Sequence, residues 1–251
     1  MKIILIIILI LSNKIIAKEV GQIEITTEAG IEVFQNEKYY LLKENVHIIS
    51  DNFELSANFV KAFFENDLYD IVRIESQDNV TLISSQGMKA KGGEINFSTK
   101  NENITIKGAE SSLIYGNIQM FSNELIKVNN MTGEFNLKGE NSELKTDSIY
   151  ILGKTIDGRY INIEGINEID ELLVGDPNQS NIKTKNINMF SKKASYSKKE
   201  DLIELFDNVK IIRDNEVITG DYAKIDTLNQ SYKVFSKNSK KVKILIKNSD
   251  E

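Results

Sequence analysis

The chain has 251 residues, no cysteine, one histidine and a formal net charge of −6. Without cysteine there is no disulfide, so stability must come from burial and strand pairing. Zinc sites of the common kinds are excluded, and a Ser-His-Asp triad would have to use His47 without a supporting Gly-x-Ser-x-Gly turn. An acidic chain whose only arginines are Arg73, Arg159 and Arg213 argues against nucleic acid as a partner.

Residues 1–17 are predicted to be a secretory signal peptide. Met1-Lys2 gives a positive start, Ile3–Leu11 is an unbroken apolar run, and Ala17 is a small residue suited to cleavage. The alternative is a retained membrane anchor, but Ser12-Asn13-Lys14 interrupts the run before the roughly 20 apolar residues that span a bilayer. Cleavage would remove two lysines and no acid, lowering the net charge from −6 to −8.

Most of the remaining chain alternates apolar and polar residues, the pattern of half-buried β-strands. Strands are predicted at 23–26, 31–33, 104–107, 113–115, 149–151, 161–163 and 182–184. Glycine, asparagine and aspartate punctuate them, and turns are predicted at Asp51-Asn52, Gly92-Gly93, Asn129-Asn130 and Asp214-Asn215.

One segment departs from this alternation. Ile166, Ile169, Leu172 and Leu173 have helical spacing, so a short helix is predicted at 166–173, ending before Asp176-Pro177. Residues 57–64 also fit a helix when taken alone, but their match to the run that begins at Gly220 favours a strand.

A five-residue phrase, Asn-Val followed by three residues of which the last two are aliphatic, occurs at 45–49, 79–83 and 208–212. A small residue and a second alternating run follow each copy, starting at Ala57, Gly92 and Gly220. Looser versions of this second run occur at 122–126, 146–150 and 184–189. Recurrence of a strand–turn–strand unit indicates an array, and the uneven spacing favours a twisted stack of antiparallel hairpins over a tight β-helix.

The third copy carries a more specific pattern, which comprises Val209-x-Ile211-x-Arg213, Ile218-x-Gly220-Asp221-Tyr222-Ala223-x-Ile225-Asp226 and Ser231-Tyr232-x-Val234. This pattern resembles the carboxy-terminal part of the OstA-like family of periplasmic lipopolysaccharide-transport proteins. The phrases near residues 45 and 79 are similar to the amino-terminal repeats of that family, whereas residues 110–200 match only as generic strands. Glu44, Asp78 and Asp207 stand where family members usually carry glycine.

The resemblance implies an all-β fold, an open-ended β-jellyroll with an apolar interior. We expect a first β repeat region at 18–110 and a second at 111–251, which contains the carboxy-terminal family motif. The resemblance further implies a non-enzymatic carrier that moves lipopolysaccharide across the periplasm from the inner to the outer membrane. The acyl chains of the lipid A part would lie in the apolar groove, and no cofactor or catalytic residue is expected.

The candidate lipid-binding residues are apolar and aromatic side chains of these repeats: Val46, Ile48, Val80, Leu82, Phe97, Val209, Ile211 and Tyr222. In each phrase the valine and the aliphatic residue two positions later share one face of a strand. Stacking the three units would line a continuous trough. The alternative is that these side chains simply fill a dry core, as in any sandwich.

Partners follow from the resemblance and from the edges of an open-ended sheet. We expect the edge strands near 22–33 and 242–247 to dock an inner-membrane LptC-like protein and an outer-membrane LptD-like translocon, or to join copies of this chain head to tail. Two other functions remain open. One is an LptC-like membrane-anchored protein that hands lipid on, which amino-terminal sequencing would distinguish. The other is a carbohydrate-active β-helix enzyme using acids such as Asp67, Asp70, Glu75 and Asp78.

Overall fold

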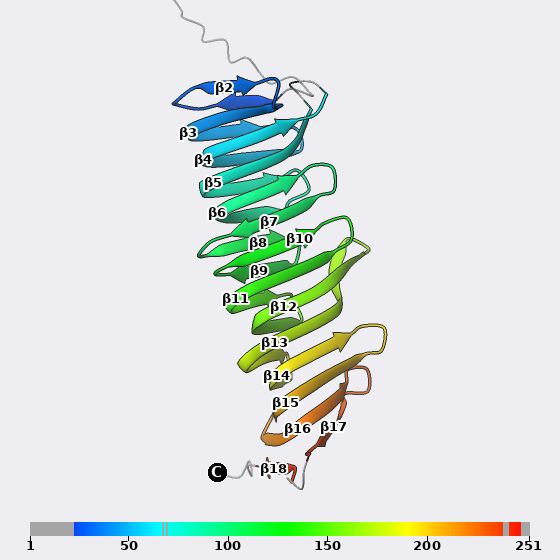
Figure 1. The fold of residues 1–251 in the computed structure, drawn as a ribbon. Helices are drawn as coiled ribbons and strands as arrows, with labels where there is room; N and C mark the ends of the chain where they lie inside the picture. Colours follow the sequence, from blue (N-terminus) through cyan, green and yellow to red (C-terminus); the bar gives the residue numbers. More distant parts are fainter. Residues whose placement is uncertain (1–22, 67, 69, 238–240, 247–251) are drawn as a thin grey trace, which may run out of the picture.

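The computed structural model describes residues 23–66, 68, 70–237 and 241–246, so the predicted signal peptide at 1–17 lies outside the described range. The described residues form 18 strands joined in one sheet, and every pairing in it is antiparallel. The predicted all-β fold, a twisted stack of antiparallel hairpins, is confirmed (Figure 1). No helix long and apolar enough to cross a membrane occurs in the described residues.

The strands are β1 (Glu24–Thr26), β2 (Ile31–Phe34), β3 (Tyr39–Ile49), β4 (Phe53–Phe64), β5 (Ile71–Ser84), β6 (Lys89–Ser98), β7 (Asn103–Lys107), β8 (Ser111–Tyr115), β9 (Ile118–Ser122), β10 (Leu125–Asn129), β11 (Glu134–Lys145), β12 (Ile149–Ile163), β13 (Ile166–Thr184), β14 (Ile187–Ser197), β15 (Leu202–Arg213), β16 (Glu216–Asp226), β17 (Ser231–Phe235) and β18 (Lys243–Ile246). Residues 57–64 lie in β4, as predicted.

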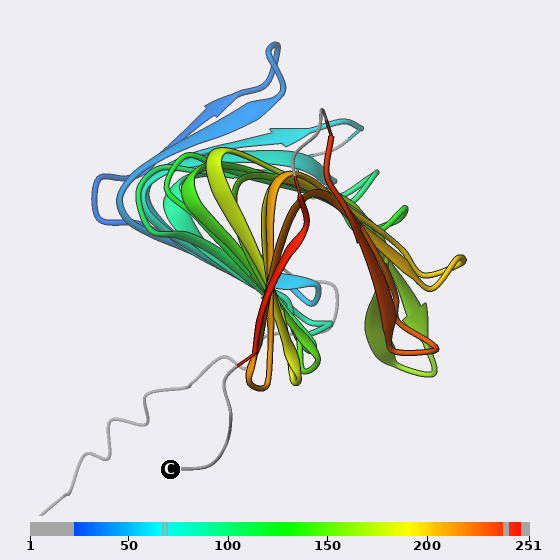
Figure 2. The ribbon, with the colours of Figure 1, turned by 90° about the horizontal axis from the view of Figure 1, so that it is seen from below.

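Each long strand bends near its middle and contributes to two layers, which gives the sheet the arched cross-section of Figure 2. In β12, for example, Ile149–Leu152 and Thr155–Ile163 pair with separate parts of β13, with a register shift between them. The first layer contains β1, β8, β9, β18 and the adjoining half-strands; the second contains β2, β7, β10, β17 and their adjoining half-strands. The layers join along the bends and separate toward the hairpin tips.

The repeated Asn-Val phrase marks the bends of β3, β5 and β15. At each bend the asparagine and the acidic residue before it have positive φ: 62° and 48° for Glu44-Asn45, 63° and 57° for Asp78-Asn79, and 61° and 56° for Asp207-Asn208. The pairing register shifts at the same points, which is the signature of a bulge that bends a strand. Asparagine and aspartate tolerate this left-handed conformation better than most residues, which suits the Asp-Asn pairs at the bends of β5 and β15.

The small residue after each phrase is the cross-strand partner of its valine. The pairs are Val46 with Ala57, Val80 with Gly92, and Val209 with Gly220. A Cβ on Gly92 would lie 2.5 Å from Cγ2 of Ile106, and one on Gly220 would lie 2.6 Å from Cγ1 of Val234. The predicted turn at Gly92-Gly93 is therefore wrong: both residues lie within β6, and close packing rather than chain reversal requires the glycine.

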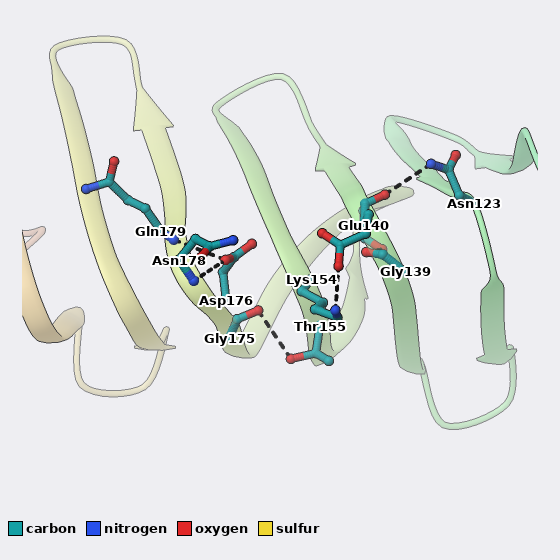
Figure 3. A network of polar contacts seen from close by, with 10 residues as sticks. Asn123, Gly139, Glu140, Lys154, Thr155, Gly175, Asp176, Asn178 and Gln179 are labelled. Atoms are coloured by element: carbon teal, nitrogen blue, oxygen red, sulfur yellow. Dashed lines mark hydrogen bonds and ion pairs between the residues drawn. The ribbon is translucent and has the colours of Figure 1, made fainter.

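Polar contacts hold the neighbouring bends of β11, β12 and β13 together (Figure 3). The bend of β13 is at Asp176, whose Oδ1 accepts hydrogen bonds from the backbone N–H groups of Asn178 and Gln179, at 2.7 and 3.0 Å. Beside it, Lys154 of β12 forms an ion pair with Glu140 of β11. The Asx turn thus supplies hydrogen bonds to two backbone N–H groups at the point where β13 changes layer.

The predicted helix at 166–173 is wrong, because these residues begin β13. Pairing with β12 shifts at Asp170, which has no opposite residue, while its carboxylate accepts a 2.5 Å hydrogen bond from Nη2 of Arg159. One extra residue changes the alternation, so the buried side chains are at 167, 169, 172 and 174. Of the four apolar residues with helical spacing, Ile169 and Leu172 are buried on either side of the bulge, whereas Ile166 and Leu173 are exposed, so the stripe does not form one buried face.

Candidate functional site

Most of the predicted lipid-binding residues lie in one continuous apolar core. Six of the eight have at most 2% of their surface exposed, namely Val46, Ile48, Val80, Leu82, Val209 and Ile211. Phe97 of the second layer is partly buried and meets Phe53 of the first layer edge to face, with ring centroids 6.0 Å apart. This contact joins the two layers in the amino-terminal half.

Tyr222 lies neither in the apolar core nor against it, unlike the other seven predicted lipid-binding residues. Its neighbour Ala223 is buried in the core, so Tyr222 faces outward, with its ring 5.2 Å from Phe206 and 5.7 Å from Phe235. The phenolic hydroxyl donates a hydrogen bond to Glu204, which holds the pKa of that carboxyl below its ordinary value. In this structure Tyr222 therefore belongs to an outer aromatic cluster.

A groove of about 710 Å³ opens between the hairpin tips of the two layers in the carboxy-terminal half. Eight aliphatic and aromatic side chains from β12 to β16 line it, namely Ile149, Ile166, Ile169, Ile187, Met189, Tyr196, Ile203 and Ile225. Polar and charged residues, among them Asp147, Lys185 and Arg213, line the rest of it. Met189, Ile203 and Ile225 belong to the apolar core, so the floor of the groove is the core surface itself. None of the eight predicted residues lines it.

Two turns of the same design form the first-layer rim of the groove. Thr146 precedes β12, and its Oγ1 accepts a 3.2 Å hydrogen bond from the backbone N–H of Ile149. Thr184 ends β13, and its Oγ1 accepts the corresponding bond from Ile187 at 3.3 Å. Each threonine thus fixes the start of the next strand, which places Ile149 and Ile187 on either side of Thr184 at the mouth of the groove.

A polar bridge between the layers closes the amino-terminal end of the groove. Asn117, in the β8–β9 turn, donates a 3.0 Å hydrogen bond to the carbonyl of Asn167 in β13 and accepts one at 3.2 Å from its backbone N–H. The Asn167 side chain donates to the carbonyl of Tyr115 at 3.3 Å and accepts from Asn162 at 2.9 Å. Because Asn167 is only 4% exposed, these bonds are well shielded from water.

Two further contacts cross between the layers at the carboxy-terminal end. Nη1 of Arg213, the last residue of β15, donates a 3.4 Å hydrogen bond to the carbonyl of Gln230 before β17. The hydroxyl of Tyr232 donates a 2.9 Å hydrogen bond to Glu216 at the start of β16. Burial, and secondarily the Glu216 carboxylate, raises the pKa of Tyr232, so this hydroxyl stays a donor at neutral pH. The groove is thus bounded at both ends and opens sideways.

The chemistry of this groove is that of apolar binding. Burial raises the pKa of the lining Tyr196, and the rim carboxylate of Glu168 is paired with Lys198. The volume of about 710 Å³ is within the range of about 300–1,000 Å³ that ligand sites occupy. If a methylene takes about the 30 Å³ of a water molecule in the liquid, a chain of roughly 12 carbons fills about 360 Å³. The groove therefore has room for about two such chains.

The sequence pattern does not identify the groove residues, because whether they line a groove depends on the distance between the hairpin tips of the two layers. The signal that was present is the pair of looser repeats at 146–150 and 184–189, which are the two rim turns. Their Thr-x-x-Ile pattern was visible, but no local pattern shows that the opposite tips leave them uncovered.

No protein-family model matches this sequence, and no curated protein matches it. Among solved structures, the chain is similar to LptH from Pseudomonas aeruginosa, the LptA-homologous periplasmic component of the lipopolysaccharide transport device. The two are 12% identical, the similarity covers 53% of this chain and 96% of that chain, and the TM-score is 0.44.

Proposed function

We propose that this chain is a periplasmic carrier that moves lipopolysaccharide from the inner to the outer membrane. The apolar groove between β12 and β16 shelters acyl chains, and the saccharide headgroup stays outside through the lateral opening. The resemblance of the repeats and of residues 209–234 to the OstA-like family, whose best-known member is LptA, supports this proposal. The observation that carries it is the groove itself, an apolar site bounded at both ends and open to solvent at its side.

The physical need for such a site is large. An exposed acyl chain of roughly 12 methylenes costs on the order of 10 kcal/mol in water, at about 0.8 kcal/mol per methylene. A lipid with several chains therefore needs a sheltered path through an aqueous compartment. Binding alone meets this need.

Acyl binding to the groove is tested with a fluorescent fatty-acid probe and with purified lipopolysaccharide. Ile187→Glu puts a charge at the partly buried rim, and we expect probe affinity to fall at least tenfold. The matched control is Leu173→Glu. Leu173 is similar in size to isoleucine, is 61% exposed on β13 and does not line the groove. Equal loss of affinity in both variants, or none in either, contradicts binding in the groove.

The seven predicted residues other than Tyr222 stay a proposal for a longer path through the core. Photo-crosslinkers at Ile48, Leu82 and Ile211 would label lipopolysaccharide if the layers part along the whole stack. A crosslinker at Ile187 would label it if only the groove is used. Labelling from the core positions would extend the site to the amino-terminal half, and labelling from Ile187 alone would confine it to the carboxy-terminal half.

We propose that the carrier binds its protein partners through the strands at its two ends. β1 and β2 pair only with β3, and β17 and β18 only with β16, within the described strands. Ile31 is 48% exposed at one end and Ile244 is 54% exposed at the other. We propose that these edges bind LptC-like and LptD-like partners or a second copy. Ile244→Pro should abolish that binding, while Leu228→Pro in the exposed β16–β17 turn should not; unchanged binding in Ile244→Pro refutes the edge assignment.

A further inference from the structure

A second pocket, of about 560 Å³, lies beside the groove on the outer face of the first layer. The two cavities share the rim turns, because Thr146, Asp147, Ser148, Thr184 and Lys185 line both. If the acyl chains of a molecule are bound in the groove and its headgroup extends past this rim, the headgroup would therefore reach the outer pocket. The pocket is a site distinct from the acyl groove but within reach of the same ligand.

Strand register brings the polar side chains of this pocket into one row. Lys145 of β11 is paired with Tyr150 of β12, Tyr150 with Lys183 of β13, and Lys183 with Asn188 of β14. Directly paired residues stand about 4.5–5.5 Å apart at Cβ, so the two lysines flank the tyrosine ring at about 10 Å from each other. Asn181 lies on the same face of β13, diagonal to Asn188.

Two buried acceptors in this pocket lack a partner. Among the described residues, Oδ1 of Asn181 and Oδ1 of Asn188 are both inaccessible and without a hydrogen bond. An unsatisfied buried polar group is unfavourable. Both side chains belong to the lining, so rotation of either amide toward the pocket would let a ligand hydroxyl supply the missing donor.

The charge of the pocket is positive. Lys145, Lys183 and Lys185 line it, and none of them makes an ion pair in the described part of the chain. The carboxylates nearby are Asp147 on the rim and Glu143, which lies beside the Tyr150 hydroxyl. Three lysines against two acids, with amide acceptors and an aromatic ring between them, suit a molecule that has both anionic groups and hydroxyls.

We propose that this outer pocket binds the anionic saccharide headgroup of the lipid whose chains occupy the groove. The inference rests on the proposed function for the identity of that lipid. Lys145 and Lys183 would receive the anionic groups, Asn181 and Asn188 would accept hydrogen bonds from sugar hydroxyls, and Tyr150 would stack against the ring face. The rim turns would separate the headgroup from the chains.

The test uses the purified chain and two separate probes. One is the phosphorylated glucosamine disaccharide of lipid A with its acyl chains removed, titrated by calorimetry; the other is the fluorescent fatty acid. For Lys183→Gln and Asn188→Leu we expect disaccharide affinity to fall at least tenfold and fatty-acid affinity to stay unchanged. The matched control, Lys127→Gln, removes an exposed lysine from β10 and should change neither.

The outcomes separate the two proposals. If the fatty acid binds but the disaccharide does not, or binds equally well to Lys183→Gln and Asn188→Leu, the headgroup site is overturned and the carrier function stands. If the disaccharide binds through Lys183 while no acyl probe binds, the carrier function is overturned and the outer site stands. A dephosphorylated disaccharide that binds as tightly as the phosphorylated one overturns the role of the lysines.

Discussion

The bridge between Asn117 and Asn167 gives the sharpest prediction about stability. Asn117→Ala removes two hydrogen bonds, of 3.0 and 3.2 Å, that link the first and second layers. Each bond contributes about 1 kcal/mol, and leaving the buried backbone groups of Asn167 unpaired costs about 1–3 kcal/mol more. We therefore expect the free energy of unfolding to fall by about 3–5 kcal/mol, which for a domain of this size lowers Tm by roughly 6–20 °C.

The measurement is urea unfolding of the purified chain, with native-state hydrogen exchange to locate the change. Exchange should speed up in the β8–β9 turn and at the start of β13, and remain slow in β4 and β5. Asn186→Ala is the control, because Asn186 is exposed on the groove rim and lies in a turn of similar polarity. If the two variants lose the same stability within about 0.5 kcal/mol, the bridge has no structural role.

Three further predictions follow from the packing. Gly220→Val should release β17, because a Cβ would lie 2.6 Å from Val234; hydrogen exchange in β17 that matches the unmodified chain would refute this. Leu82→Ala should cost about 2–5 kcal/mol in urea unfolding and leave fatty-acid affinity for the groove unchanged, since the residue is buried and does not line the groove. Tyr222→Phe should raise the pKa of Glu204 toward its ordinary value in an NMR titration. The depressed folded pKa stabilises the chain above the unfolded pKa and the gain is lost as pH falls, so the variant should differ from the parent near neutral pH and converge with it in acid.

Much of the fold could be predicted because its signals are local. Period-two alternation identified strands, and the recurring Asn-Val phrase identified units that the structure shows to be bends. The errors at Gly92-Gly93 and at 166–173 share one cause. In both, a bulge or a change of layer inside a strand produced a local pattern that is typical of another element.

The groove could not be predicted for a different reason. Whether inward side chains touch or leave a space depends on the distance between hairpin tips far apart in sequence. In the amino-terminal half Phe53 and Phe97 meet across that distance, whereas in the carboxy-terminal half Ile149 and Ile187 line an open space. Aromatic residues near strand ends were visible in the sequence, but their partners in the opposite layer were not.

The order of strand pairing gives the molecule an adjustable length. From β3 to β6 and from β11 to β16, each bent strand bonds to the strands just before and after it in the chain, with neighbours about 4.8 Å apart. Adding or deleting one up-and-down pair would thus change the span by about 10 Å and leave every other interface intact. Duplicating or deleting a hairpin would therefore lengthen or shorten the molecule with no redesign of its ends.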